Sequence, residues 1–173
     1  MKFLITADIH GSITTWITLR SLMEKADGLV VAGDLFDTRY GSYGHPDFDP
    51  GAIRQHLTAA DQTLYYVYGN CDEPSFCPGH HHALTFSAGR KNIFLHHGSP
   101  KVDVPADADI IIQGHTHIWA LEKTEGRIFM NPGSLARPRK GPATYGILDD
   151  TSVSILSLET GTPLMTLDIY PCG

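Results

Sequence analysis

The sequence predicts an α/β fold, and three observations support that prediction. Apolar runs that end in Gly, Asp or Asn alternate with amphipathic helical segments over residues 2–68. From residue 83 onward the chain is a series of short β-rich segments. The length of 173 residues suits one domain with a substantial core. No repeat, linker or low-complexity segment interrupts the chain, so we expect residues 1–173 to form a single domain.

The first helix is expected between two buried strands. Residues 2–8 form an apolar run that is typical of a buried strand, and residues 29–32 form a second. Ser12 is placed to cap a helix that Asp27 and Gly28 end. The apolar positions of this helix recur at helical spacing and are Ile13, Trp16, Ile17, Leu19, Leu22, Met23 and Ala26.

A second helix and a third strand follow a loop. Residues 38–48 are rich in Gly and aromatic side chains, and we expect them to form that loop. Asp49 and Pro50 suit the N-cap and the first helical position. Residues 64–68 have the composition of a third strand. The apolar face of the second helix would carry Ile53, Leu57 and Ala60.

The second half of the chain is expected to be mostly β. Asp149, Asp150 and Thr151 are typical of a hairpin turn. Strands are expected at residues 83–86, 92–96, 110–113, 127–130, 144–148, 152–158 and 164–169.

Composition and charge exclude several classes of protein. The chain is 42% hydrophobic and 18% charged, as in ordinary globular proteins. No apolar stretch reaches membrane-spanning length, and the N-terminus runs directly into a strand, so we expect no membrane partner and a cytoplasmic location. The net charge of −6 argues against stable nucleic-acid binding. Three cysteines, Cys71, Cys77 and Cys172, indicate reduced thiols rather than a disulfide framework.

Fragments that contain metal-binding residue types follow several of the expected strands. Open α/β sheets gather ligands at the carboxyl ends of strands, so we expect these fragments to converge. Residues i and i+2 of an extended segment point to the same side, so Asp8 with His10, and His115 with His117, are expected to be paired for chelation. Their donors suffice for two divalent ions, an arrangement suited to phosphate-ester hydrolysis. The fragments are Asp8-Ile9-His10-Gly11, Gly33-Asp34, Gly69-Asn70-Cys71-Asp72, His97-Gly98 and Gly114-His115-Thr116-His117.

Together with Asn131-Pro132-Gly133-Ser134, this ordered set resembles the calcineurin-like metallophosphoesterases, in particular their small bacterial and archaeal phosphodiesterase branch. The resemblance spans nearly the whole chain, including Thr144-Tyr145-Gly146. It implies an α/β fold that is a four-layer α/β/β/α sandwich with two mixed β-sheets. It also implies a metal-dependent phosphodiesterase that hydrolyses small phosphodiesters.

The resemblance assigns seven residues to a binuclear metal site. Asp8, His10 and His117 would hold the first ion, while Asn70, His97 and His115 would hold the second and Asp34 would bridge both. Of these, Asp34, Asn70 and His97 are expected to act in catalysis. Two ions about 3.5–4 Å apart can clamp the attacking and leaving oxygens, and a hydroxide that bridges them would attack phosphorus. Members of the branch are commonly supported by manganese, so Mn²⁺ is favoured, while the donor set also suits Fe²⁺, Zn²⁺ or Ni²⁺.

Several residues near these fragments have two interpretations. Cys71 is either a packed small residue, which we favour, or a proton donor to the leaving group. Asp37 and Asp72 either orient ligand imidazoles or belong to turns. The loop at 38–48 either shapes substrate specificity or is an ordinary anchored loop. Its candidate specificity residues are Tyr40, Tyr43, His45 and Phe48.

Other polar features favour a structural interpretation. His96 is expected to point away from His97 in an extended strand. The run His80-His81-His82 lacks the usual zinc spacing and is expected to be a solvated loop. The basic cluster Arg137-Pro138-Arg139-Lys140 is expected to be solvated surface, with binding of an anionic substrate as the alternative. Ser99 stands where many relatives have a second His, which would shift metal affinity slightly.

Two alternatives to a phosphodiesterase stay open. A phosphomonoesterase or nucleotidase could use the same site, and only a comparison of substrates separates the two. The fold also occurs in a trafficking-complex subunit that works as a non-catalytic protein-binding scaffold. Such scaffolds are expected to lose metal ligands, whereas this chain has all seven. We therefore expect a small phosphodiester as the partner, with a homodimer as an open question.

Overall fold

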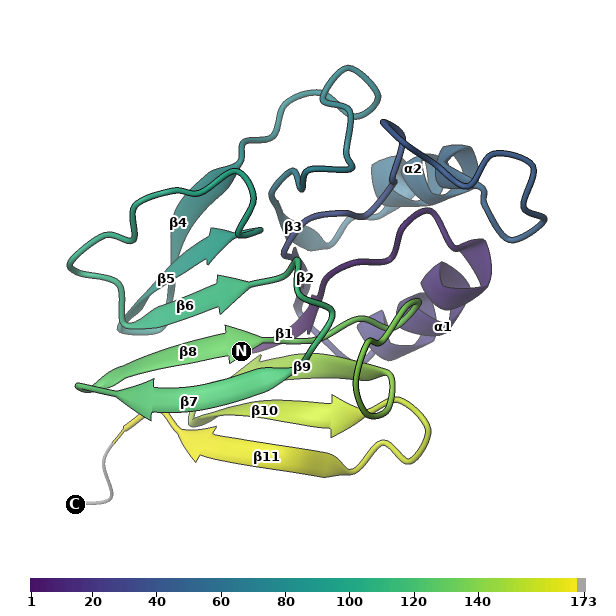
Figure 1. The fold of residues 1–173 in the computed structure, drawn as a ribbon. Helices are drawn as coiled ribbons and strands as arrows, with labels where there is room; N and C mark the ends of the chain where they lie inside the picture. The colour runs from purple at the N-terminus through teal and green to yellow at the C-terminus, as the bar shows by residue number, and fades with distance from the viewer. Residues whose placement is uncertain (171–173) are drawn as a thin grey trace.

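Two β-sheets pack face to face in the computed structural model, which describes residues 1–170 (Figure 1). Cys172 lies outside the described residues. The six-stranded sheet contains β1 (Lys2–Thr6), β2 (Gly28–Val31), β3 (Thr63–Tyr66), β9 (Thr144–Asp149), β10 (Ser152–Ser157) and β11 (Pro163–Asp168). The five-stranded sheet contains β4 (Ala83–Ala88), β5 (Lys91–His96), β6 (Ile110–Gln113), β7 (Ala120–Thr124) and β8 (Arg127–Asn131).

Each sheet combines parallel and antiparallel strands: the parallel strands form one end of the six-stranded sheet and the centre of the five-stranded sheet. The strand order is β11-β10-β9-β1-β2-β3 in one sheet and β4-β5-β6-β8-β7 in the other. Strands β1, β2 and β3 run parallel, as do β5, β6 and β8. The loops that follow the carboxyl ends of these parallel strands therefore have the chance to meet at one edge of the sandwich.

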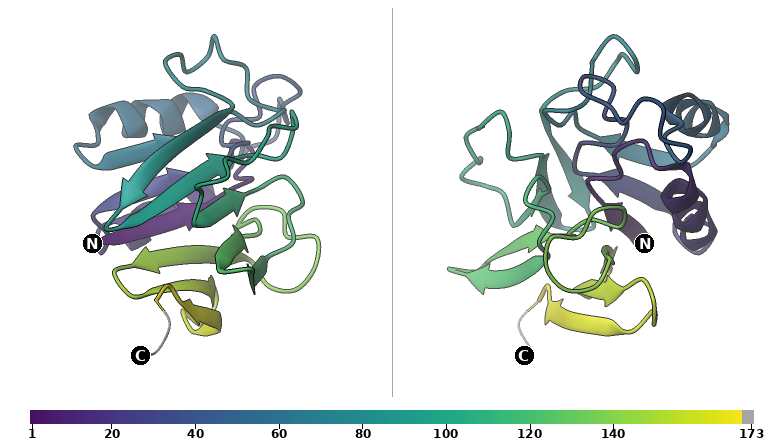
Figure 2. Two further views of the ribbon diagram at one scale, coloured as in Figure 1. Left: turned by 90° about the vertical axis from the view of Figure 1, so that its left-hand side faces the viewer. Right: turned by 45° about the vertical axis from the view of Figure 1, so that its right-hand side comes forward.

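Both helices, α1 (Ile13–Met23) and α2 (Pro50–Ala59), lie on the same side of the six-stranded sheet (Figure 2). Each begins at its predicted cap. The Ser12 hydroxyl accepts the Thr15 N–H at 3.2 Å, and the Asp49 carboxylate accepts the Ala52 N–H at 2.9 Å. Helix α1 ends at Met23, before the predicted last apolar position at Ala26.

Two apolar cores flank the six-stranded sheet. The core between the sheets combines residues such as Ile5 and Val30 with Leu95 and Ile112 of the other sheet. The core beneath the helices is centred on Trp16 and other fully buried side chains. Because the side chains of β1, β2 and β9 alternate between the two cores, the middle of this sheet is buried on both faces, whereas the edge strand β11 is largely exposed.

The outer face of the five-stranded sheet is covered differently. No helix of the described residues covers it; instead Phe94, Ile111 and Phe129 pack against Val102 and Ala108 of the loop between β5 and β6. The predicted sandwich of two mixed sheets is confirmed, but in the described residues a loop covers the side where the four-layer arrangement would place a second layer of helices. None of the helices in the described part of the chain has the length and apolar character needed to cross a membrane.

The predicted strands are present near their expected positions, but β7 was not predicted. It is an edge strand in which Leu121 is the one buried residue, and its other positions are largely polar or charged. A single buried side chain leaves no alternation for a sequence pattern to reveal. The predicted turn before β10 is confirmed, because the Asp149 carboxylate accepts the N–H groups of Thr151 and Ser152 at 2.8 Å each.

The core between the sheets should dominate the free energy of unfolding. Ile5 is fully buried, whereas Ile17 on α1 is 53% exposed. We expect Ile5→Ala to lower the free energy of unfolding by about 2–5 kcal/mol through lost burial and a residual cavity. The matched substitution Ile17→Ala should change it by less than about 0.5 kcal/mol. Urea unfolding followed by circular dichroism measures both, and equal losses would contradict this assignment of the core.

Candidate metal centre

The predicted site residues converge at one edge of the sandwich, where the parallel strands of both sheets end. Asp8 follows β1, Asp34 follows β2 and Asn70 follows β3. From the other sheet, His97 follows β5, and His115 and His117 follow β6. Segments far apart in sequence are brought together because the carboxyl ends of both sets of strands face the same way.

The first cluster joins Asp8, His10 and His117. The Nε2 atoms of the two histidines lie 3.2 Å apart, and Asp8 Oδ1 lies 3.4 Å from His117 Nε2 and 3.9 Å from His10 Nε2. The other ring nitrogens are engaged: His10 Nδ1 faces Asp37 Oδ2 at 3.2 Å, and His117 Nδ1 faces the Arg137 carbonyl at 2.8 Å. Both partners are acceptors, so a neutral imidazole keeps its proton on Nδ1 and points a bare Nε2 inward.

The second cluster repeats this arrangement around His97. His97 Nδ1 donates to the Ala32 carbonyl at 2.8 Å, and its Nε2 lies 3.2 Å from both Asp34 Oδ2 and Asn70 Oδ1. The ring of His115 stands 5.0 Å from that of His97, between centroids. Asp34 also shares a compact group of potential ligand atoms with His10, which places this carboxylate between the two clusters.

Burial and charge shift the pKa values of Asp8 and Asp34 in opposite directions. Burial raises the pKa of Asp8 to about 7. Burial also opposes ionisation of Asp34, but without a metal ion a proton on His97 Nε2, whose pKa Asp34 raises, supplies a hydrogen bond and a charge that, together with the Cys71 N–H, lower the pKa of Asp34 to about 2. The Asp8 Oδ1 atom is buried without a hydrogen-bond partner. Inward-facing lone pairs and an orphaned buried carboxylate oxygen are what a divalent cation would satisfy, so these residues fit a metal centre.

The backbone of five site residues is left-handed rather than extended, and this conformation directs their side chains toward the two clusters. Positive φ angles occur at Asp8 (56°), His10 (51°), Asp34 (51°), His115 (73°) and His117 (60°). Such strain in non-glycine residues tends to cluster at functional sites. The expectation that extended backbone pairs His115 with His117 is wrong, because the turn sends His117 to His10 and His115 to His97.

Two glycines allow the loops to approach this closely. A Cβ atom on Gly69 would overlap the Asp34 carboxylate, and one on Gly114 would overlap the Ala32 carbonyl. Ser134 further ties the loops together, since its hydroxyl donates to the Asp8 carbonyl at 2.7 Å. Asn131 acts in the same way by donating to the Gly114 carbonyl at 2.8 Å. The sequence motif named these two residues, but their positioning contacts appear only in three dimensions.

Asp37 and Asp72, which had the same two interpretations, have different roles. Asp37 contacts the His10 ring and therefore orients an imidazole of the first cluster. Asp72 accepts backbone N–H groups from Leu35, Phe36, Asp37 and Gly69, so it holds the turns around the site. A carboxylate saturated by backbone donors in this way is a structural anchor.

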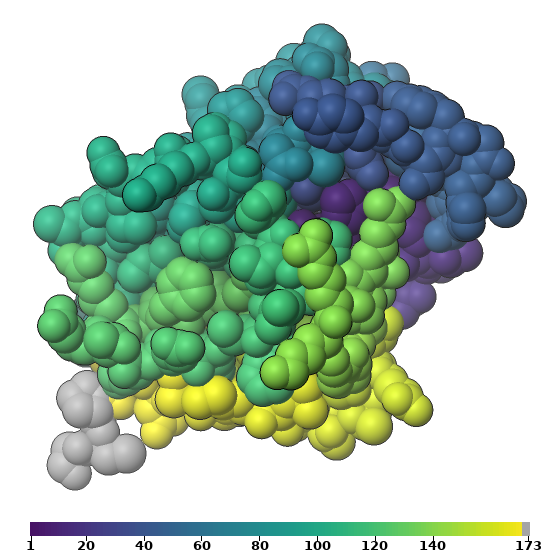
Figure 3. Space-filling model, viewed as in Figure 1, coloured from purple at the N-terminus to yellow at the C-terminus, as the bar shows by residue number. Residues whose placement is uncertain are grey.

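A cavity of about 340 Å³ opens over the two clusters. In the space-filling view, the loop after β2 (dark blue) and the loop after β8 (light green) border a hollow where purple N-terminal atoms are visible (Figure 3). Residues 137–140 are all exposed, as expected for solvated surface, and two of them, Arg137 and Arg139, also line this cavity. The cavity is lined by His10, Asp34, Asn70, Cys71, His115, His117, Arg137 and Arg139.

Cys71 borders the cavity as a neutral thiol. Its Sγ accepts the Asn70 amide at 3.1 Å, a contact that turns the Asn70 oxygen toward His97. Burial, with the charges of Asp34 and other carboxylates, raises the pKa of Cys71 far above its usual range. A thiol that resists ionisation is a poor acid, which favours the packing interpretation.

The other histidines lie outside these clusters. His96 is buried on the opposite face of β5, stacked on Phe94, which confirms that it points away from His97. His80 packs against Tyr66 with ring centroids 4.7 Å apart, so the solvated-loop interpretation is wrong for this residue, whereas His81 and His82 are exposed. Among the described residues, the groups suited to hold a metal include none of these four histidines.

Comparison with known proteins gives consistent matches. A family model described as the calcineurin-like phosphoesterase superfamily domain matches residues 1–152. Phosphodiesterase YfcE of Escherichia coli K12 is 29% identical over 99% of this chain and 100% of its own length. A solved structure of YfcE, described as a phosphoesterase from E. coli, is similar with a TM-score of 0.84 at 27% identity, covering 98% of this chain and 100% of that one.

Two more distant matches extend the comparison. YsnB, a probable metallophosphoesterase of Bacillus subtilis, is 30% identical over 86% of this chain and 83% of its own. The structure of Vps29 from Entamoeba histolytica, complexed with zinc, has a TM-score of 0.66 at 21% identity and covers 98% of this chain and 100% of that one. At that identity the likeness to Vps29 shows the fold alone.

The raised pKa of Asp8 predicts an unusual pH dependence of stability. In chelator-treated protein the folded state keeps a proton on Asp8 up to about pH 7, whereas the unfolded chain loses it near the ordinary aspartate pKa of 3.8. The folded state therefore binds more protons in this window, and stability falls as pH rises, by at most about 1.4 kcal/mol per pH unit. The low pKa of Asp34 contributes no change here, because both of its states are ionised above about pH 5.

Asp8→Asn should remove this dependence. We expect the free energy of unfolding of the wild-type chain to fall, relative to the variant, between about pH 4.5 and 7. Urea unfolding at each pH, with chelator present, measures this difference in the free energy of unfolding. Subtracting the two values cancels the contribution of the ionisable groups that the two proteins share. A constant or rising difference would show that Asp8 is ionised in the folded protein across this range.

Proposed function

The chain belongs to the calcineurin-like phosphoesterase superfamily, and from this membership we propose that it is a metal-dependent phosphodiesterase acting on small phosphodiesters. The observation that carries the proposal is the pair of clusters whose inward-facing atoms are all acceptors once the histidines are neutral. A site that presents lone pairs without protons is built for cations rather than for a neutral substrate. Two adjacent cation sites are the arrangement used to hydrolyse phosphate esters.

We assign the ligands from the geometry of the clusters and the family motifs. Asp8, His10 and His117 would hold one ion, and Asn70, His97 and His115 the other. Asp34, which shares groups of ligand atoms with both His10 and His97, would bridge. The N–H of Cys71 donates to Asp34 Oδ1 at 2.8 Å and leaves Oδ2 directed at His97, which holds the carboxylate in place.

Two divalent ions bound there would supply a hydroxide nucleophile at neutral pH and stabilise charge on the phosphoryl oxygens. The chain's own residues supply the rest. Arg137 and Arg139 at the cavity mouth offer cationic donors to the single negative charge of a diester. Asp34 and Asn70 line the cavity where the phosphoryl group would be held, and the buried His97 contacts both at 3.2 Å. Hydrolysis adds the oxygen of water to phosphorus and breaks one ester P–O bond. The products are a monoester and an alcohol.

The finer assignments follow from the donor set and the surface. Mn²⁺ is the metal we favour, because oxygen and imidazole donors without a thiolate suit it. A reducing cytoplasmic location is supported by Cys71 and Cys77, which are both free thiols. A homodimer is supported by Leu164 and Met165, exposed apolar residues on the edge strand β11.

The first test compares substrates and metals. Chelator-stripped protein should hydrolyse bis-p-nitrophenyl phosphate when Mn²⁺ is added and remain inactive without it, because the lone-pair clusters need cations. Turnover of p-nitrophenyl phosphate in parallel separates a diesterase from a monoesterase. Loss of all turnover with every divalent ion would favour a non-catalytic scaffold of the same fold.

The bridging role of Asp34 can be tested separately. Asp34→Asn removes the charge that would join two ions, so we expect turnover to fall by more than the roughly 100-fold that loss of a supporting ligand contact costs. Far-ultraviolet circular dichroism should be unchanged. Asp61→Asn, at an exposed position after α2, is the matched control and should keep full activity. Near-native turnover of Asp34→Asn would rule out the two-metal assignment.

A further inference from the structure

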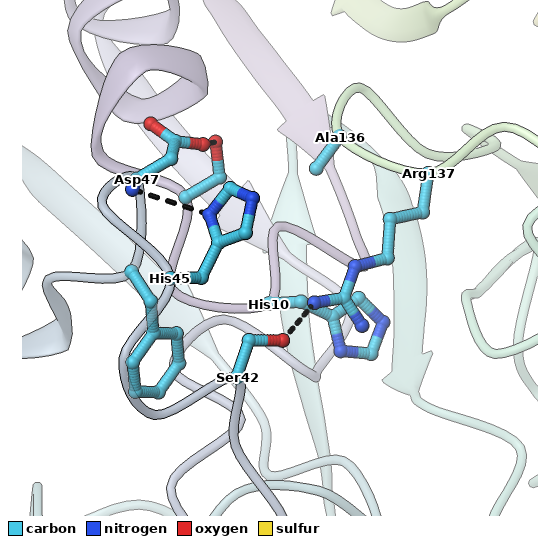
Figure 4. Close-up of a pocket in the computed structure, with 8 residues that line it drawn as sticks. His10, Ser42, His45, Asp47, Ala136 and Arg137 are labelled. Atoms are coloured by element: carbon cyan, nitrogen blue, oxygen red, sulfur yellow. Dashed lines mark hydrogen bonds between the residues drawn. The ribbon is translucent and has the colours of Figure 1, made fainter.

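A second cavity, of about 240 Å³, opens beside the candidate metal centre. The two cavities share His10 and Arg137. Figure 4 shows Arg137 next to His10 and reaching toward Ser42, while His45 and Asp47 lie on the far side. The remaining lining residues are Ser12, Ser42, His45, Asp47, Phe48 and Ala136. A group attached to a phosphate at the metal centre could therefore enter this space directly.

The wall formed by the 38–48 loop is held firmly against the first metal-binding fragment. Asp47 accepts the Ser12 hydroxyl at 2.6 Å, and its carbonyl accepts the Ile13 N–H at 2.9 Å. The Phe48 ring packs so closely on Gly11 that a Cβ atom there would overlap it. The loop is thus built onto the same segment that carries His10, and its distance from the metal centre is set by these contacts.

Arg137 marks the boundary between the two cavities. Its guanidinium donates to the Ser42 hydroxyl at 2.7 Å and lies 3.6 Å from Asp37 Oδ2, the carboxylate that orients His10. A phosphoryl group at the metal centre and its ester substituent would lie on either side of this cation. Arg137 is therefore placed to bind the phosphate while the lining beyond it contacts the substituent.

The lining is rich in hydrogen-bond donors. The Asp47 N–H donates to His45 Nδ1 at 3.2 Å, so a neutral His45 carries its proton on Nε2 and has that donor left to offer. The Ser42 hydroxyl accepts from Arg137 and keeps its own proton to donate. Phe48 and Ala136 add a small apolar surface. Donors beside an aromatic ring suit the hydroxyls and C–H groups of a polyol.

The size of the cavity limits the substituent. Pockets for drug-sized ligands span about 300–1,000 Å³, and this space falls below that range. A glyceryl or pentosyl group would fit, whereas a long acyl chain would extend into solvent. The opposite side of the metal centre is more open, since His115 is exposed there and gives a departing alcohol a way out.

We propose that this cavity is the subsite for the ester group that stays on phosphorus, and that it selects a small hydroxylated substituent such as glyceryl or pentosyl. The inference rests on the proposed phosphodiesterase activity and adds its substrate class. The substituent remains bonded to phosphorus through its ester oxygen and leaves as part of the monoester product. His45 and Ser42 act as binding groups that contact this substituent.

The test uses two probes with the same leaving group. Glyceryl p-nitrophenyl phosphate and methyl p-nitrophenyl phosphate differ only in the retained substituent, and both release p-nitrophenol. Wild-type protein with Mn²⁺ should show a kcat/KM about tenfold higher for the glyceryl ester, the size expected of one or two hydrogen bonds. Ala136→Leu fills the cavity and should reduce this ratio to about one, because the larger side chain takes the space of the retained glyceryl group.

Two further variants guard against misfolding and indirect effects. His45→Ala removes a donor without adding bulk and should lower the ratio by about threefold. Ala59→Leu makes the same enlargement at an exposed site on α2 and should leave the ratio unchanged. Calorimetric titration with the products glycerol 1-phosphate and methyl phosphate gives a readout independent of turnover, in which wild type should bind the former about tenfold more tightly.

The outcomes separate the subsite from the activity itself. Equal kcat/KM for both esters in wild-type protein, or a preference that survives Ala136→Leu, would overturn the subsite. Failure to hydrolyse either ester with any divalent ion would overturn the proposed phosphodiesterase activity. In that case the calorimetric comparison still decides the subsite, because binding of the two phosphates needs no turnover.

Discussion

The site depends on one constraint: the lone pairs of histidine nitrogens and of carboxylate or amide oxygens face one another. Backbone carbonyls and Asp37 hold the Nδ1 protons of His10, His97 and His117, so each Nε2 points at carboxylate or amide oxygens 3.2–3.9 Å away. Such an arrangement is repulsive until a proton or a metal ion enters it. The buried Asp8, whose pKa is raised to about 7, shows how poorly the protein alone accommodates this charge.

The rest of the fold holds these groups in place although their lone pairs repel one another. The parallel strands of the two sheets direct five loops to one edge, and the apolar core between the sheets fixes the distance between those loops. Left-handed residues then turn the side chains inward, while Asp72 and Ser134 tie neighbouring loops together. Stability supplied by the core thus offsets strain at the site, as is common for functional centres.

The elements that the sequence predicts correctly are those with strong local signals. The caps at Ser12 and Asp49, the buried strands and the order of ligand fragments were all predicted, because each depends on neighbouring residues alone. The edge strand β7 was not predicted, since one buried side chain produces no alternation of apolar and polar residues. The presumed extended pairing of His115 and His117 failed because the φ angle after a strand cannot be deduced from periodicity.

The sequence by itself determined the α/β class and the residues available to a metal centre, because strand propensity and ligand chemistry are local properties. The family resemblance implied how those residues are shared between two clusters, but only the tertiary structure decided that Asp37 orients a ring while Asp72 anchors a turn. It also brought Arg137 next to Ser42 and created a second cavity beside the first. These relations join loops far apart in the chain, and their distances depend on how the two sheets pack.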